Sequence, residues 1–333
     1  MLYLSIFLFI ALLWSVINPK LVSDFSKEAS LPLRGMLALL IVMHHLSLRL
    51  TYMIPEESKV NYLRDFNCWG EYVVSIFFFL SGYGIVKSYQ KKGTSYLDGF
   101  ISGRLLKLMI PFIICSLIYL LFYPPTFSSI ISLNTWKNDC PLLPSSWFVV
   151  AILLQYLIFY IVALFFRSVN ITIVSAWLLS VLLMILLKHL EFKTFWWHSL
   201  LAFNVGMSIS YHEVFLRKYM LSKKLIFLVF CLLLIFFYLN GFIDSLTKWS
   251  FLLNVVLLPF FVWQMICNGI IHNTFFLNFI GKISYEIYLV HVAILCFLFP
   301  VIGKYPILFI VLTYALSLMC AYALNYLVRK IVC

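Results

Sequence analysis

The stretch Leu33–Leu50, LRGMLALLIVMHHLSLRL, decides the fold of this chain. It is an apolar run of membrane length, and it carries Arg34 at its start and His44 and His45 in its second half. An ionisable side chain at the centre of a membrane helix costs about 2.5–3.5 kcal/mol on insertion scales, and such residues usually serve a function. The stretch therefore predicts a transmembrane helix that carries a functional polar site.

The spacing of these residues adds to that prediction. At about 100° per residue, the steps from Arg34 to His45 make about three turns plus 20°, so both side chains lie on one face, about 16 Å apart. His44 falls about 80° to the other side. Arg34 could hold a phosphate-bearing donor, and His45 could act as a general base. The alternative is that Arg34 is an ordinary positive-inside anchor and that the histidines bond neighbouring helices.

The composition indicates a polytopic membrane protein. The chain has 333 residues, of which 64% are hydrophobic and only 11% are charged, whereas soluble domains are about 25% charged. A net charge of +12 is explained by cytoplasmic loops that contact anionic lipid, so we expect no nucleic-acid partner.

The cysteines and histidines predict no metal site. None of the eight cysteines forms a C-x-x-C pair, so neither a zinc site nor a disulfide framework is indicated. The adjacent histidines diverge on one helix, and no H-x-x-x-H pattern supports a metal. Cys68 and Cys140 both fall in predicted outer loops and could pair with each other.

Eleven apolar runs are long enough to cross a membrane, which predicts an all-α bundle forming a single membrane domain over 1–333. The first run has no positive n-region and no small-residue cleavage site, so we expect it to be retained as a helix. The runs are Met1–Ile17, Leu33–Leu50, Glu71–Val86, Leu105–Tyr123, Trp147–Phe166, Ile171–Leu187, Phe195–Tyr211, Leu225–Gly241, Trp249–Cys267, Ser284–Pro300 and Pro306–Val328.

The basic residues predict how these helices are oriented. With the N-terminus outside, 16 of the 24 Lys and Arg residues fall in inner segments and 8 fall in outer segments. Cytoplasmic loops carry an excess of Lys and Arg. We therefore expect an outside N-terminus and a cytoplasmic C-terminus, with Arg34 at the inner mouth of its helix and His45 towards the outer half.

Five motifs follow one another along the chain. Arg34 and His45 are separated by ten residues, and the other four are GEYVVSIFFFLSGYG at 70–84, GRLLKLMIPF at 103–112, WFVVAILLQY at 147–156 and ISYEIYLVH at 283–291. In order and spacing, these motifs resemble those of the membrane-bound acyltransferase-3 proteins across about Leu33–Val328. The family signature is an arginine, ten residues and a histidine, which here matches His45 and not His44.

The resemblance implies both an architecture and an activity. The architecture is a ten-helix core over 33–328, with 1–32 as an extra helix and loop. The activity is that of an O-acyltransferase in the bacterial inner membrane, which moves an acyl group, most often acetyl, to a hydroxyl of a cell-surface glycan or lipid-linked sugar. Acetyl-CoA or another acyl-CoA would be the co-substrate, with no bound cofactor. A transporter or flippase of glycan intermediates is the alternative, although no inverted repeat or paired broken helices are evident.

The resemblance also assigns roles to two pairs of residues. Arg34 and His45 become the catalytic pair, and Arg104 and Lys107 become donor-binding residues. Arg104 and Lys107 lie one turn apart, so both could face the same anion, or both could be topological anchors. Lys107 stands where the family often has an arginine, and a lysine does not make the bidentate contact of an arginine.

Eight further residues are predicted to line the substrate pocket, namely His44, Glu71, Ser81, Gly82, Trp147, Asn204, Tyr285 and His291. Glu71 could cap its helix or orient a histidine from the outer side. Ser81 and Gly82 could permit close backbone approach or a break in their helix. A Ser81 nucleophile is the alternative, although no G-x-S-x-G turn or acid partner supports it. His291 and Asn204 could contact substrate or simply pack between helices.

Overall fold

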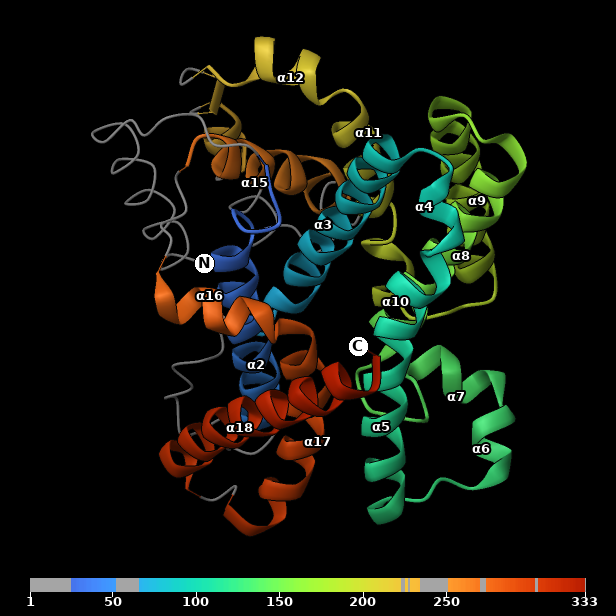
Figure 1. The fold of residues 1–333 in the computed structure, drawn as a ribbon. Helices are drawn as coiled ribbons and strands as arrows, with labels where there is room; N and C mark the ends of the chain where they lie inside the picture. Colours follow the sequence, from blue (N-terminus) through green and yellow to red (C-terminus); the bar gives the residue numbers. More distant parts are fainter. Residues whose placement is uncertain are drawn as a thin grey trace.

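The computed structural model describes residues 25–51, 66–222, 225–226, 228–233, 251–269, 274–302 and 305–332. These residues form helices joined by turns, with no strand among them (Figure 1). The all-α prediction is therefore confirmed. The predicted helix Met1–Ile17 and most of the predicted helix Leu225–Gly241 lie outside the described residues.

Within the described residues, seven of the predicted spans are helices long and apolar enough to cross a membrane. In the fourth span the π-helical turn η2 continues directly into α5. The spans are α2 (Leu31–Thr51), α3 (Trp69–Lys92), η2 (Ile101–Leu105) with α5 (Leu106–Phe122), α8 (Trp147–Phe166), α9 (Val169–His189), α17 (Ser284–Ile302) and α18 (Pro306–Val332).

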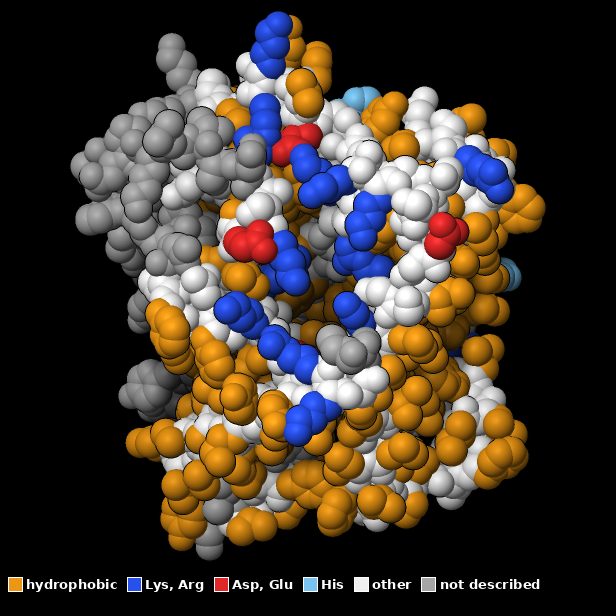
Figure 2. Space-filling model, in the orientation of Figure 1, with side chains coloured by type: hydrophobic (Ala, Val, Ile, Leu, Met, Phe, Trp, Pro, Cys, Tyr) orange, Lys and Arg blue, Asp and Glu red, His pale blue; other side chains and the backbone are white. Residues whose placement is uncertain are grey.

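Large apolar side chains remain exposed on several of these helices. Leu121 of α5 is 80% exposed, and Leu178 of α9 is 63% exposed. Figure 2 shows apolar side chains covering the lower part of the molecule. Because a soluble protein rarely exposes so large an apolar surface, this arrangement fits a polytopic membrane protein.

The predicted span Phe195–Tyr211 is not one helix. It forms α10 (Phe195–His198) and α11 (Ala202–Tyr211), with a break between them. Within the break, the Ser199 hydroxyl donates to the Glu71 carbonyl of α3 at 3.2 Å. A ten-residue helix is about 15 Å long, only half of a hydrocarbon core of about 30 Å. The segment therefore lines the inside of the bundle and does not cross it alone.

The predicted span Trp249–Cys267 contains a second π-helical turn. From residue 251 the chain is helical through η3 (Leu253–Leu257) into α15 (Leu258–Cys267). Pro259 lies in the first turn of α15, two residues after the end of η3, and has no N–H to continue the regular hydrogen-bond ladder. Single π-helical turns of this kind occur frequently at functional sites.

In the part of the chain that is described, five short helices lie between the predicted spans. They are α4 (Ser95–Asp98), α6 (Phe127–Ile131), α7 (Leu133–Asn138), α12 (Glu213–Met220) and α16 (Phe275–Lys282). The helix α16 lies against α2, where a β-carbon at Gly35 would overlap the Leu277 carbonyl and one at Gly281 would overlap the Leu31 carbonyl. Helix α2 is thus held along the half that carries Arg34.

A similar glycine contact joins α3 to α11. A β-carbon at Gly82 would overlap the Phe203 carbonyl, and one at Gly206 would overlap the Phe79 carbonyl. Small residues allow the backbones of membrane helices to approach this closely. The predicted close approach at Gly82 is therefore present, and α3 runs through it without a break.

Candidate active site

Three histidine rings meet where α2 packs against α17. The ring centroid of His45 lies 4.8 Å from that of His44 and 5.0 Å from that of His291. His291 is completely buried. The structure thus brings together three of the predicted site residues, from segments about 250 residues apart in the sequence.

Backbone carbonyls fix the hydrogen positions of two of these rings. Nδ1 of His44 lies 3.0 Å from the Phe66 carbonyl oxygen, and Nδ1 of His291 lies 3.0 Å from the Ile287 carbonyl oxygen. Because a carbonyl oxygen only accepts, Nδ1 carries the hydrogen in both rings, and Nε2 is the acceptor when the ring is neutral. In the part of the chain that is described, Nε2 of His291 is buried and has no hydrogen-bond partner.

His45 differs from its two neighbours. Its imidazole is partly exposed, and no hydrogen bond joins it to another described residue. Among the contacts described above, His44 and His291 touch the His45 imidazole only by ring packing. Among the described residues, the ring nitrogens of His45 therefore have no hydrogen-bond partner, whereas His44 and His291 are each hydrogen-bonded to a backbone carbonyl.

Two arginines lie within electrostatic range of each other towards the other end of α2. Arg104 donates from Nε to the Tyr96 hydroxyl at 2.9 Å, and from Nη2 to the Ser88 hydroxyl at 3.2 Å and the Gly84 carbonyl at 3.3 Å. Arg34 lies close enough to interact electrostatically with Arg104, and its Nε is buried without a partner among the described residues.

The surroundings of this arginine pair supply little negative charge. The Tyr156 hydroxyl is near both guanidinium groups. Among the described residues, the carboxylate that acts on Arg34 is that of the exposed Glu28, and its effect is weaker than that of Tyr156. Two neighbouring cations with unfilled hydrogen-bonding capacity fit an anion such as a phosphate group.

Lys107 does not join this pair. Its side chain is exposed, and within the described ranges it makes no ion pair or hydrogen bond. The expectation that Arg104 and Lys107 face one anion rested on α-helical spacing. Arg104 instead lies in the π-helical turn η2, where residues three apart no longer stack as they do in an α-helix.

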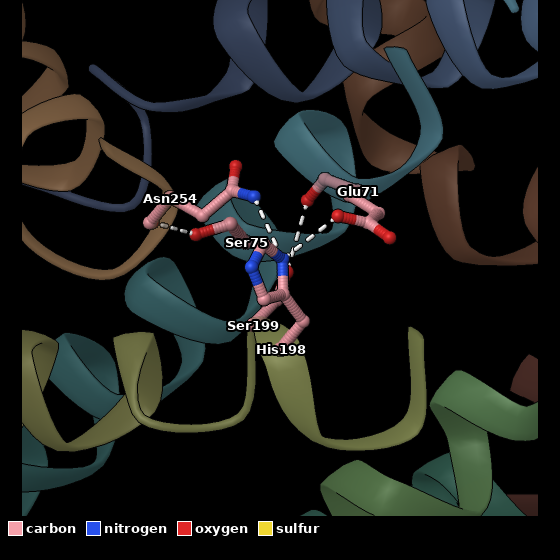
Figure 3. Close-up of polar contacts among 5 residues, drawn as sticks. All are labelled: Glu71, Ser75, His198, Ser199 and Asn254. Atoms are coloured by element: carbon pink, nitrogen blue, oxygen red, sulfur yellow. Dashed lines mark hydrogen bonds and ion pairs between the residues drawn. The ribbon is translucent and has the colours of Figure 1, made fainter. Parts of the chain in front are cut away.

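Glu71 contacts a histidine, but not one of the three on α2 and α17. Its carboxylate Oε2 lies 2.8 Å from Nδ1 of His198 on α10 (Figure 3). Nδ1 of His198 also lies 3.2 Å from the side-chain amide of Asn254 in η3. His198 and Asn254 were missed in the sequence, where the signal was a lone polar residue in an apolar run.

The remaining predicted pocket residues hold helices together. Trp147 packs on Phe195 with centroids 5.0 Å apart, and the Tyr285 hydroxyl donates to the Leu108 carbonyl at 2.7 Å. The Asn204 amide donates to the Ser180 hydroxyl at 3.0 Å, and both are fully buried. Ser81 makes no hydrogen bond to the described residues. None of these contacts reaches the histidine group.

The predicted outer cysteines do not form a disulfide. Cys68 is exposed just before α3, and Cys140 is buried between α7 and α8. Burial raises the pKa of the Cys140 thiol, which keeps this thiol protonated and unreactive at neutral pH.

One comparison with known proteins gives a match. Residues 33–326 match the family model described as an acyltransferase domain, Acyl_transf_3. No curated protein and no solved structure matches the chain. The matched region includes all three histidines of the α2–α17 group and both arginines.

Proposed function

Because this chain belongs to the acyltransferase-3 family, and is thus a membrane acyltransferase, we propose that it moves an acetyl group from acetyl-CoA to a hydroxyl of a cell-surface glycan or lipid-linked sugar. The observation that carries the proposal is the division of α2 into two polar ends. Arg34 and Arg104 form a cationic pair at one end, and His45 lies in a group of three histidines at the other.

The arginine pair is the proposed site for the phosphates of acyl-CoA. Figure 2 shows Lys and Arg side chains around a hollow near the centre of the molecule. The elements around it carry the exposed residues Lys91, Lys92, Lys107, Lys282, Arg329 and Lys330. An electropositive concave surface raises the local concentration of an anionic ligand. The thioester would then extend along α2 towards His45, about 16 Å from Arg34.

His45 is the proposed general base. It takes the proton of the acceptor hydroxyl as the oxygen attacks the thioester carbonyl and the new C–O bond forms. The C–S bond then breaks, and the CoA thiolate receives the proton from the His45 imidazolium. The transfer therefore balances without a further reactant. A positioned base contributes about 10²–10⁴-fold to such a reaction.

The test is the transfer of labelled acetyl from acetyl-CoA to glycan in membranes that contain the His45→Ala variant. We expect the rate to fall by at least about 10²-fold, while the amount of protein in the membrane stays normal. Full activity in His45→Ala would overturn the assignment, and a greater loss in His44→Ala would move the base by one position. Acetyl labelling that is unchanged in His45→Ala, together with glycan transport that is lost in this variant, would favour a transporter.

A further inference from the structure

A second polar group lies at the N-terminal end of α3, which we call the Glu71 cluster. It consists of Glu71 and Ser75 of α3, His198 and Ser199 at the end of α10, and Asn254 of η3 (Figure 3). Three elements that are far apart in the sequence thus direct polar side chains at one point. The mechanism proposed above uses none of these residues.

The cluster is built around the side chain of His198. Glu71 and Asn254 both approach Nδ1 of this ring, at 2.8 Å and 3.2 Å. The Ser75 hydroxyl donates to the Asn254 carbonyl, and the Ser199 hydroxyl donates to the Glu71 carbonyl. These two contacts tie the backbones of η3 and α10 to α3, so the cluster is held rigidly.

Nδ1 of His198 cannot donate a hydrogen bond to Glu71 and accept one from Asn254 at the same time. If Nδ1 carries a hydrogen, it donates to the Glu71 carboxylate, and the amide oxygen of Asn254 must face it. If Nδ1 carries none, the amide nitrogen of Asn254 donates to it. In either arrangement one polar atom of the Asn254 amide has no partner among the described residues.

This unsatisfied amide is the feature that points to a ligand. Asn254 is only 1% exposed, and a buried polar group without a partner is costly and rarely retained. The Glu71 side chain beside it is 37% exposed, so solvent reaches this member of the cluster. The π-helical turn that presents Asn254 is itself a feature frequent at functional sites.

Aromatic rings border the cluster. The ring of Trp197 lies 5.9 Å from that of His198, and the ring of Phe251 lies 5.7 Å from it. An apolar wall with a few convergent polar groups is the usual form of a small-molecule site. A hydroxyl can donate to the Glu71 carboxylate and can also accept or donate at the Asn254 amide. A molecule with several hydroxyls on an apolar ring therefore fits this site.

The cluster also adjoins the histidine group. A β-carbon at Gly70, the residue before Glu71, would overlap the imidazole of His44. His44 and Glu71 also interact electrostatically. One turn of α3 therefore touches both the ring beside His45 and the carboxylate of the Glu71 cluster.

We propose that the Glu71 cluster is a sugar-binding subsite, which holds ring hydroxyls of the acceptor while another of its hydroxyls reaches His45. This inference rests on the proposed function, because it names how the acceptor of that reaction is held. Glu71 and Asn254 bind the sugar directly, and His198, Ser75 and Ser199 position them.

The first experiment measures binding without any acyl donor. Saturation-transfer NMR on the protein in nanodiscs gives dissociation constants for the methyl β-glycosides of glucose, galactose and N-acetylglucosamine. We expect at least one glycoside to bind, and we expect Glu71→Gln and Asn254→Asp each to weaken this binding about tenfold. Cyclohexylmethanol, a ring with one primary hydroxyl and no ring hydroxyls, should bind equally to all variants.

The matched control is Glu213→Gln, which makes the same change in a carboxylate of α12 that pairs with Lys87 and Arg217. Its affinity for the glycosides should equal that of the wild type. Absence of glycoside binding to the wild-type protein, or equal binding by all correctly folded variants, would overturn the subsite.

The second measurement separates the subsite from the proposed function. In transfer assays, Glu71→Gln and Asn254→Asp should raise KM for the bound glycoside about tenfold and leave KM for acetyl-CoA unchanged. Equal effects on both KM values would contradict a role in holding the acceptor. Glycoside binding that depends on Asn254, in a protein that transfers no acetyl group, would retain the subsite and refute the proposed reaction.

Discussion

At the scale of single residues, His45 depends on the two histidines that flank it. The ring of His44 lies between the Phe66 carbonyl, which accepts from its Nδ1, and the backbone of Gly70, which leaves room for the ring only because it has no side chain. The ring of His291 is held from the other side by the Ile287 carbonyl. His45 is thus positioned by neighbours whose own positions are fixed by the backbone.

This arrangement predicts a large effect from adding one methyl group at Gly70. In Gly70→Ala the new β-carbon would overlap the His44 imidazole, so the ring must move and His45 loses its neighbour. A displacement of about 1 Å in a reacting group can cost about 10²-fold in rate. We expect acetyl transfer, measured in membranes at equal protein content, to fall about 10–100-fold.

The control for this prediction is Gly103→Ala, because a β-carbon at Gly103 would meet no atom within 4 Å. It should leave the transfer rate near that of the wild type. The double variant Gly70→Ala with His44→Ala removes the overlap, so its thermal stability should return to that of His44→Ala alone. Normal activity in Gly70→Ala would show that the position of His44 does not matter to His45.

At the scale of elements, the contact between α3 and α11 holds in place the helix that carries Glu71 near its N-terminal end and that binds Arg104 in its C-terminal half. The contact depends on Gly82 and Gly206, each of which lies against a backbone carbonyl of the other helix. Backbone atoms cannot turn away as a flexible side chain can. A methyl group at either glycine therefore has to separate the helices.

We expect Gly82→Ala to lower the temperature of thermal unfolding in detergent, because overpacking of this kind typically costs about 1–3 kcal/mol. Gly84→Ala is the matched control on the same helix, since a β-carbon there would meet only the Arg104 side chain, at 4.0 Å. Equal unfolding temperatures for the two variants would contradict the close packing of α3 and α11.

The elements also show where sequence reasoning succeeds and where it ends. The long spans follow from hydropathy alone, because the bilayer fixes their length. Helix α16 has eight residues, and the break at Ser199 depends on a contact with Glu71 of another helix. Neither feature leaves a periodic signal within its own segment, so both appear only once the tertiary contacts are known.

The same distinction holds for the site. Arg34 and His45 share one helix, so their common face follows from helical periodicity. His291 comes from α17 and His198 from α10, and only the packing of the bundle shows that the first faces His45 and the second faces Glu71. The exposure of Lys107 likewise follows from the π-helical turn η2, which the apolar sequence around it does not indicate.

At the scale of the whole molecule, the arginine pair and the histidine group lie at different depths along α2. The arginine pair is near the elements that carry the exposed Lys and Arg residues, and the histidine group and the Glu71 cluster lie towards the other end. Figure 2 shows the basic side chains in the upper and central part of this face and apolar side chains below. Because basic residues favour the cytoplasmic side of a membrane, we expect the end of α2 that carries Arg34 to face the cytoplasm.

This asymmetry predicts that the donor enters from one side only. Acetyl-CoA is charged and does not cross a sealed bilayer, so inside-out vesicles should transfer acetyl from added acetyl-CoA, whereas sealed right-side-out vesicles should not. Permeabilising the right-side-out vesicles with detergent should restore transfer, which serves as the control for intact enzyme. Equal rates in both kinds of sealed vesicle would place the arginine pair within reach of the outer solution. Transfer in right-side-out vesicles alone would reverse the assigned orientation of α2, with Arg34 at the outer surface and His45 towards the cytoplasm.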